Sequence, residues 1–161
     1  MARPSTTLEV GDIAPEFRLF TVTGTSWRLS QNLPVALYFG RGTFCPQCRK
    51  QLVQLQRYYP LYRQVGVQVA MVLGQSFSKT AAYLEKNPFS FPLLPDEERR
   101  VIKEYGVYHR LGLAAYNLSR PAVFLIDFGR QIQYIHVGSS PFDIPPQDFL
   151  LVEASKLTDR R

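Results

Sequence analysis

Short apolar runs alternate with segments of helical periodicity along this chain. Residues 35–39 and 65–73 are apolar and rich in β-branched or aromatic side chains, which is typical of strands buried in a sheet. Between them, apolar positions recur at helical spacing from Pro46 to Tyr59, and Pro60 follows. The pattern predicts a strand, a helix of about three turns that ends or kinks near Tyr59, and a second strand.

The second half of the chain predicts further helices and one hairpin. The helical segments are residues 76–85, 96–105 and 146–157. Residues 122–127 and 132–137 predict the two strands of a hairpin. Strands that alternate with helices and end in a hairpin predict an α/β fold with a mixed central β-sheet flanked by helices on both faces.

Length and composition indicate one globular domain over residues 1–161. Hydrophobic residues make up 45% of the chain and charged residues 20%, which is ordinary for a globular protein. We expect flexible ends at residues 1–7 and 158–161. Residues 108–119 show no clear period, so we expect a loop there over one end of the sheet.

Hydropathy and charge restrict the partners and the location. The longest apolar runs have five residues, far fewer than the ~20 of a membrane helix, and no apolar segment follows residues 1–5. We therefore expect a cytoplasmic protein without a membrane partner. The net charge is +6, but the basic residues are scattered, so we do not expect nucleic-acid binding.

The two cysteines, Cys45 and Cys48, are the strongest chemical signal in the chain. Two cysteines cannot build a multi-bridge scaffold or a four-cysteine zinc site, and His109 and His136 are distant in sequence. We therefore expect no metal and no cofactor. A pair of structural thiols or half of a metal site remains the alternative to redox chemistry.

The position of the cysteines favours redox chemistry. Cys45 follows a predicted buried strand and starts a predicted helix, where unpaired backbone N–H groups and the helix dipole favour a thiolate. We expect a lowered pKa for Cys45. Cys48 lies about one turn later, more buried and close enough to form a disulfide with Cys45, so it is the candidate resolving cysteine.

Several motifs, in order and at matching spacing, resemble the AhpC/TSA peroxiredoxin family over roughly residues 8–157. They are VGDIAPEF at residues 10–17, Gly24, LS at residues 29–30, RGTFCPQC at residues 41–48, FPLLPD at residues 91–96, YGV at residues 105–107, RPAVFLID at residues 120–127 and Gly129. The chain is most similar to peroxiredoxin-like members with Arg-Gly-x-x-Cys-Pro-x-Cys at the active turn. The resemblance implies a thioredoxin-like fold, here with an N-terminal extension.

The resemblance also implies roles for individual residues. Cys45 corresponds to the peroxidatic cysteine, and Arg120 to the arginine beside the thiolate, where it would stabilise charge developing on a peroxide oxygen. An ordinary surface charge is the alternative for Arg120. Pro121 is similar to the cis-proline opposite the Cys-x-x-Cys turn of thioredoxin-like proteins, although a trans proline opening a strand is the alternative. Arg41 and Pro46 complete the candidate substrate-binding residues, and Arg41 has a solvated surface charge as its alternative.

The active turn also departs from the family pattern. Tyr38 stands where the family has a proline, and Gly42 stands where it has a threonine, with Thr43 one place later. Thr43 is the candidate for the hydroxyl that holds the peroxide, and a helix-entry residue is the equal alternative.

Three functional hypotheses follow from these features. Two are enzymatic, and the third is a non-catalytic redox sensor or metal-binding protein. The first is a thiol peroxidase that reduces hydrogen peroxide or organic hydroperoxides and is regenerated by a thioredoxin- or glutaredoxin-type reductant. The second is a thioredoxin- or TlpA-like thiol-disulfide oxidoreductase that uses the same two cysteines. By analogy with the family, a homodimer is a candidate assembly that the sequence itself does not decide.

Overall fold

A five-stranded sheet forms the centre of the structure, a computed structural model that describes residues 6–111 and 116–159. The strands follow the order β5, β4, β3, β8, β9, with bounds Leu93–Pro95, Gln68–Leu73, Val35–Gly40, Ala122–Ile126 and Ile132–Val137. Strand β3 pairs in parallel with β4 and antiparallel with β8. The sheet is therefore mixed, as predicted.

The alternation of side chains along β3 divides the interior into two cores. All six residues of β3 are buried. Ala36 and Tyr38 join the core on one face of the sheet, while Leu37 and Phe39 join the core on the other. Because successive side chains of a strand point to opposite faces, an apolar run without alternation requires cover on both faces.

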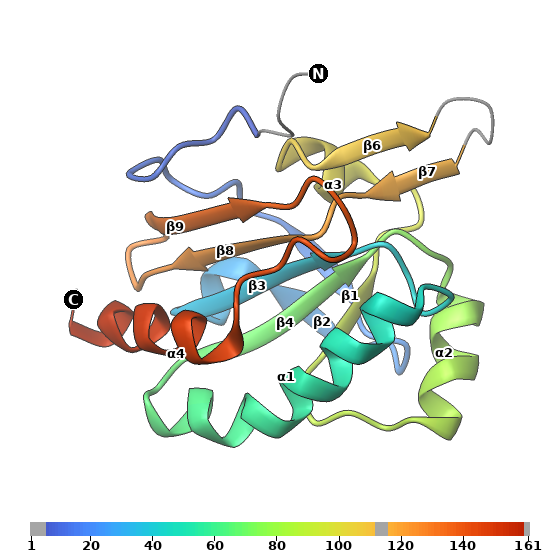
Figure 1. Cartoon of the computed structure of the whole chain (residues 1–161), viewed down its shortest axis with the longest axis horizontal. Coiled ribbons are helices and arrows are strands. Elements are labelled where there is room, and N and C mark those ends of the chain that lie inside the picture. Colours follow the sequence, from blue (N-terminus) through green and yellow to red (C-terminus); the bar gives the residue numbers. More distant parts are fainter. Residues whose placement is uncertain (1–5, 112–115, 160–161) are drawn as a thin grey trace.

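Helices and a small hairpin provide that cover (Figure 1). Helices α1 (Pro46–Gln64) and α4 (Gln147–Ser155) pack against each other on the Tyr38 face, and α4 continues into the 3-10 helix η2 (Lys156–Asp159). Helix α3 (Arg100–Glu104) and the hairpin of β1 (Arg18–Phe20) and β2 (Ser26–Arg28) cover the Phe39 face. The short η1 (Leu29–Gln31) follows β2, and α2 (Phe77–Lys86) lies between β4 and β5 in the chain.

Helix α1 is longer than predicted. It continues through Pro60 to Gln64, so the expectation of an end near Tyr59 is wrong. The turn after Pro60 is held by Tyr62, which is fully buried and whose hydroxyl lies 2.8 Å from that of Tyr38 on β3. Tertiary packing of this turn offsets the backbone hydrogen bond that a proline removes.

Helix α3 is shorter than predicted, because residues 96–99 form a turn ahead of it. Arg99 adopts a left-handed conformation with φ 57°, which a continuous helix does not allow. The buried Asp96 carboxylate accepts a hydrogen bond of 2.9 Å from the N–H of Ile102. The acidic residue therefore satisfies a backbone donor of α3 from outside the helix.

The segment expected to be a loop contains two strands instead. Strands β6 (Tyr108–Leu111) and β7 (Tyr116–Ser119) pair antiparallel as a separate two-stranded sheet, which Figure 1 shows above one end of the main sheet. Residues 112–115 between them lie outside the described part of the chain.

Two further expectations concern the ends of the chain and the hydropathy of the helices. Most of the ends expected to be flexible, residues 1–5 and 160–161, lie outside the described residues. Within the described ranges, no helix has both the length and the apolar character needed to cross a bilayer.

Candidate redox site

Cys45 occupies the N-cap of α1, directly after the turn that leaves β3. Its backbone is extended, with φ −87° and ψ 121°, and Pro46 fills the first helical position. Proline is favoured there because its fixed φ suits the helix and its missing N–H would have had no helical partner. The sequence therefore fixes the start of α1 next to the Cys45 sulfur.

The pKa of Cys45 lies below its ordinary value. Burial acts to raise this pKa, but hydrogen bonds from the backbone N–H groups of Cys48 and Gln47, a hydrogen bond from the Cys48 thiol and the positive charge of Arg41 outweigh it. The N–H groups of Gln47 and Cys48 belong to the first turn of α1, where backbone donors have no acceptor within the helix. The helix start and Arg41 therefore stabilise a thiolate at Cys45.

Cys48 has the opposite electrostatic character. Burial raises its pKa to about 11, and a negative charge on Cys45 contributes to the rise. Both cysteines are reduced, and each is only 5% exposed. The pair therefore consists of a nucleophilic Cys45 and a protonated Cys48 one turn away.

A hydrogen-bonded network around Gln75 holds the turn that precedes Cys45. The Thr43 N–H donates to Gln75 Oε1 at 2.9 Å, and Gln75 Nε2 donates to the hydroxyls of Thr43 at 3.1 Å and of Thr80 at 2.9 Å. Arg49 adds a hydrogen bond of 2.9 Å to the Thr43 carbonyl. Thr43 and Gln75 are buried, so this polar network is shielded from water.

Gln75 was not predicted from the sequence. It follows β4, which runs parallel to β3, so the carboxyl ends of both strands meet at the edge of the sheet where Cys45 lies. A polar residue directly after a buried parallel strand was the signal that could have identified it.

Gly42 allows the Thr43 turn to approach Gln75 this closely. A Cβ atom at Gly42 would lie 2.6 Å from Gln75 Oε1 and 2.6 Å from the ring of Phe44. The position that the family pattern gives to threonine is therefore restricted here to glycine by its neighbours. Thr43, the next residue, carries the buried hydroxyl instead.

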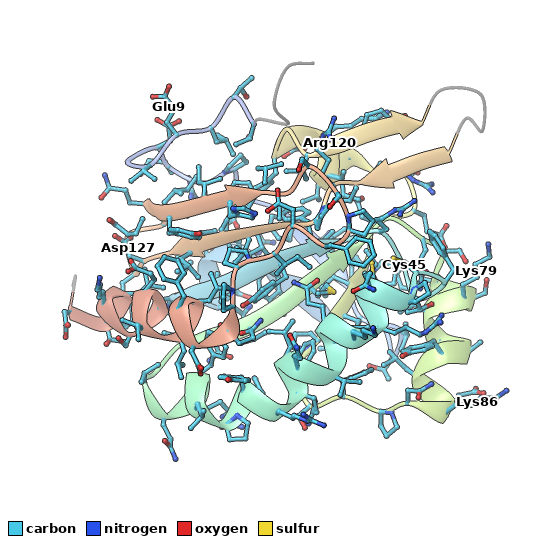
Figure 2. All side chains as sticks on the ribbon, in the orientation of Figure 1. Glu9, Cys45, Lys79, Lys86, Arg120 and Asp127 are labelled. Carbon is cyan, nitrogen blue, oxygen red and sulfur yellow. The ribbon has the colours of Figure 1, made fainter. Side chains whose placement is uncertain are left out.

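Arg120 lies between β7 and β8, and none of the contacts that the structure describes joins it to Cys45. Arg120 is half-buried, and its backbone N–H donates to the Val107 carbonyl at 2.7 Å. Figure 2 shows Arg120 on the connection from β7 to β8 and Cys45 at the start of α1. Arg41 is the cation among the main causes of the lowered Cys45 pKa, so the role of Arg120 stays a prediction.

The structure resolves the conformation of the bond before Pro121. The bond between Arg120 and Pro121 is trans, and within the described ranges the cis peptide bond is that of Leu33–Pro34. Of the two alternatives that the sequence left open for Pro121, the structure has the trans proline that precedes a strand. The Pro121 carbonyl accepts a hydrogen bond of 2.7 Å from Gly138, so it connects the start of β8 to the end of β9.

Tyr38, at the proline position of the family pattern, belongs to the core. Its hydroxyl lies 2.8 Å from the hydroxyl of Tyr62 and 3.4 Å from the side-chain oxygen of Gln147.

His136, on β9, lies 3.1 Å from Asp143, which belongs to the loop after β9. In the described part of the chain, no group of three or more His, Cys, Asp or Glu side chains could hold a metal ion.

Comparison with known proteins places this arrangement in a family. The family model described as AhpC/TSA family matches residues 10–135. The chain belongs to the AhpC/TSA family.

Thiol redox proteins of two kinds are similar to this chain. The chain is 26% identical to the thiol-disulfide oxidoreductase ResA of Geobacillus thermodenitrificans, over 83% of this chain and 72% of ResA. It is 30% identical to the chloroplastic peroxiredoxin Q of Triticum aestivum, over 81% of this chain and 64% of that protein. The crystal structure of the peroxidoxin BcpB from Mycobacterium tuberculosis superposes with a TM-score of 0.80 at 26% identity, covering 96% of this chain and 99% of BcpB.

These similarities confirm the thioredoxin-like fold and the oxidoreductase class predicted from the AhpC/TSA motifs. They do not distinguish peroxide reduction from thiol-disulfide exchange, since both peroxiredoxins and a disulfide oxidoreductase are similar to this chain. The choice between the two reactions therefore depends on the geometry of the cysteine site.

Proposed function

We propose that this protein is a thiol peroxidase that reduces hydrogen peroxide or organic hydroperoxides through Cys45, with Cys48 as the resolving cysteine. The observation that carries this proposal is the burial of a stabilised thiolate: Cys45 is only 5% exposed although its pKa is lowered. A peroxide is small enough to reach such a sulfur, whereas a protein disulfide must bring its own backbone and side chains to the attacked atom.

The proposed reaction has two steps. The Cys45 thiolate attacks one peroxide oxygen, an S–O bond forms and the O–O bond breaks, and the leaving oxygen takes a proton to become water or an alcohol. The sulfur of Cys48 then attacks the sulfenic acid. The S–S bond forms, the S–O bond breaks, and the thiol proton of Cys48 leaves with hydroxide as water.

The chain's own residues support both steps. The first-turn N–H groups and Arg41 hold the thiolate, and the buried Thr43 hydroxyl lies two residues from Cys45 in the same turn. The raised pKa of Cys48 keeps its proton until the sulfenic acid forms, which separates the attacking role from the resolving role. A thioredoxin- or glutaredoxin-type reductant completes the proposed cycle, after the turn that carries the Cys45–Cys48 disulfide has opened to expose it.

Thiol-disulfide exchange is the second candidate function. It is favoured by the Cys-x-x-Cys pair at a helix start and by the similarity to ResA. Of the features expected to favour it, the cis form of Pro121 is not present.

Two assays on the purified protein separate these candidates. We expect peroxide consumption with dithiothreitol, its loss in Cys45→Ser, and slow reduction of insulin disulfides. In Cys48→Ser, one peroxide should still oxidise Cys45, and a dimedone adduct of the sulfenic acid should accumulate. Rapid insulin reduction without peroxide consumption would establish disulfide exchange instead.

A further inference from the structure

A wide cleft opens beside the redox site, between the turn that carries Cys45 and helix α2. It has a volume of about 1060 Å³ and borders the active turn at Arg41, Thr43 and Phe44. Typical small-molecule sites measure roughly 300–1,000 Å³. The cleft is therefore far larger than hydrogen peroxide requires, and its position suits a second, larger substrate.

The charges around the cleft are mostly positive. Four cations line it, against the single carboxylate of Glu97: Arg41, Lys79, Lys86 and Arg99. Lys79 and Lys86 are exposed and stand seven residues apart on α2, which places them about two turns apart on one face of the helix. Figure 2 shows Lys79 at the end of α2 near Cys45 and Lys86 at the far end.

The contacts of Lys79 and Lys86 leave their positive charges in place, because neither lysine belongs to an ion pair that the structure describes. The described ion pairs join Arg130 to Glu16, His136 to Asp143 and Lys156 to Glu153. Glu97 is engaged at the start of α2, where its carboxylate accepts a hydrogen bond from the Phe77 N–H. Arg99 donates to the Gly74 carbonyl at 2.9 Å, which fixes its guanidinium at the wall of the cleft.

The lining combines this charge with apolar surface. Phe44, Ala82 and Tyr83 contribute ring and methyl groups between the cations. A ligand that suits the cleft therefore carries a carboxylate and an apolar chain. Cations beside the redox site also lower the pKa of an incoming thiol, which favours the thiolate form that attacks disulfides.

We propose that this cleft binds a small carboxylate-bearing thiol that reduces the oxidised Cys45–Cys48 pair, with Lys79 and Lys86 holding its carboxylate. The proposal rests on the redox function of the two cysteines given above and names a further reductant class for it. A small thiol also suits sulfurs that are only 5% exposed in the reduced protein.

The electron balance is that of two successive exchanges with a dithiol. The ligand thiolate attacks one protein sulfur, the Cys45–Cys48 bond breaks, and the other protein sulfur leaves as a thiolate that takes a proton. The second thiol of the ligand then attacks the mixed disulfide. The ligand is released as a cyclic disulfide, oxidised by two electrons, and both cysteines are reduced.

The test compares two dithiols that differ in one charge, dihydrolipoate and its neutral amide, dihydrolipoamide. The full chain is first oxidised with diamide, so that the experiment does not depend on peroxide. Reduction is then followed in a single turnover by alkylation of free thiols and mass spectrometry. The ratio of the rate with dihydrolipoate to the rate with dihydrolipoamide isolates the effect of the carboxylate.

We expect this ratio to exceed one in the wild-type protein and to fall about fivefold in the double variant Lys79→Gln, Lys86→Gln, the scale of two exposed charge contacts. Raising the salt to about 0.5 M should lower the wild-type ratio in the same direction. Lys156→Gln, on η2 away from α2, is the matched control and should keep the wild-type ratio.

Three outcomes of the ratio measurement would overturn the proposal. They are a wild-type ratio of one, a double variant that keeps the wild-type ratio, and a control variant that loses as much as the double variant. An effect of the double variant on oxidation by a carboxylated hydroperoxide, but not on reduction, would assign the cleft to the oxidant and equally overturn it. The peroxidase proposal fails separately, if peroxide does not oxidise Cys45.

Discussion

At the scale of single residues, the chemistry depends on two sulfurs with opposite environments. Cys45 faces the backbone N–H groups of the first turn of α1 and the charge of Arg41, whereas Cys48 is enclosed by the core. A thiol that must attack benefits from a lowered pKa, and a thiol that must wait benefits from a raised one. The three-residue spacing places both conditions within one helical turn.

The alkylation rates of the two cysteines should separate with pH. Cys45 should react with iodoacetamide with a midpoint below about 8.5, the usual value for a free cysteine, because the helix start and Arg41 favour its thiolate. Cys48 should react only at a much higher pH, since burial raises its pKa to about 11. Mass spectrometry of quenched samples gives both rates, and a Cys45 midpoint at or above 8.5 would contradict the assignment.

The two arginines near the site should affect different steps. Arg41→Met should raise the alkylation midpoint of Cys45, because it removes a charge that lowers that pKa. Arg120→Met should slow oxidation of Cys45 by peroxide on the order of a hundredfold if Arg120 stabilises the leaving oxygen, with a much smaller effect on disulfide exchange.

Stopped-flow measurement of peroxide oxidation at several pH values separates these effects. If Arg120→Met lowers both reactions equally, Arg120 acts through the Cys45 pKa alone. An unchanged peroxide rate in Arg120→Met would remove Arg120 from the catalytic site.

At the scale of elements, the site exists because β3 and β4 are parallel. Their carboxyl ends bring the turn before Cys45 against the turn after β4, where the side chain of Gln75 connects Thr43 to Thr80. Neither turn alone satisfies its own polar groups. The hydrogen bonds between them hold the entry to α1 in position.

Removing the Gln75 side-chain amide should make the turn before α1 less rigid, while Cys45 keeps its lowered pKa. In Gln75→Met, the Thr43 N–H loses its acceptor, so we expect peroxide oxidation to slow by about tenfold and unfolding to become easier by about 1–3 kcal/mol. The alkylation midpoint of Cys45 should stay near the wild-type value, because the N–H groups of Gln47 and Cys48 are untouched. A midpoint that rises together with the loss of rate would show that Gln75 acts on the thiolate instead.

Elements with strong local patterns were predictable, and elements defined by distant pairing were not. Strand β3, the start of α1 and the β8–β9 hairpin follow from apolar runs and a proline at a helix start. Strands β6 and β7 lack a period, and only their mutual pairing makes them strands. Gln75 contacts a residue 32 positions away, so no local pattern could assign its partner, and Pro60 was outweighed by the packing of Tyr62.

At the scale of the whole molecule, the free energy of folding depends in part on carboxylates outside the turn that carries the cysteines. In the loop after β9, the N–H and hydroxyl of Ser139 donate to Asp143 Oδ2 at 2.8 Å and 3.1 Å, and His136 lies beside Asp143 Oδ1. These contacts, the Ser139 N–H first among them, hold the pKa of Asp143 below its ordinary value. Its folded-state pKa is thus lower than its unfolded-state pKa.

Stability should therefore fall in acid partly through Asp143. A lowered folded-state pKa contributes stability that is present above the unfolded pKa of about 3.9 and is lost as the pH falls through the folded value. Asp143→Asn should reduce the difference between urea midpoints at pH 6 and pH 3. Asp159→Asn near the C-terminal end is the control, and an unchanged difference in Asp143→Asn would exclude this contribution.

Pro60 divides α1 into two units that need not open together. Because a proline has no N–H, the carbonyl of Gln56 lacks its helical donor, and the ladder of hydrogen bonds is interrupted between the half that carries the cysteines and the half that carries Tyr62. Amide hydrogens in the first half should therefore exchange with solvent deuterium by local opening, while those near Tyr62 require the core to open. In the proposed reaction, the turn that carries Cys45 and Cys48 can then rearrange when the disulfide forms, while the far end of the same helix stays anchored to the sheet.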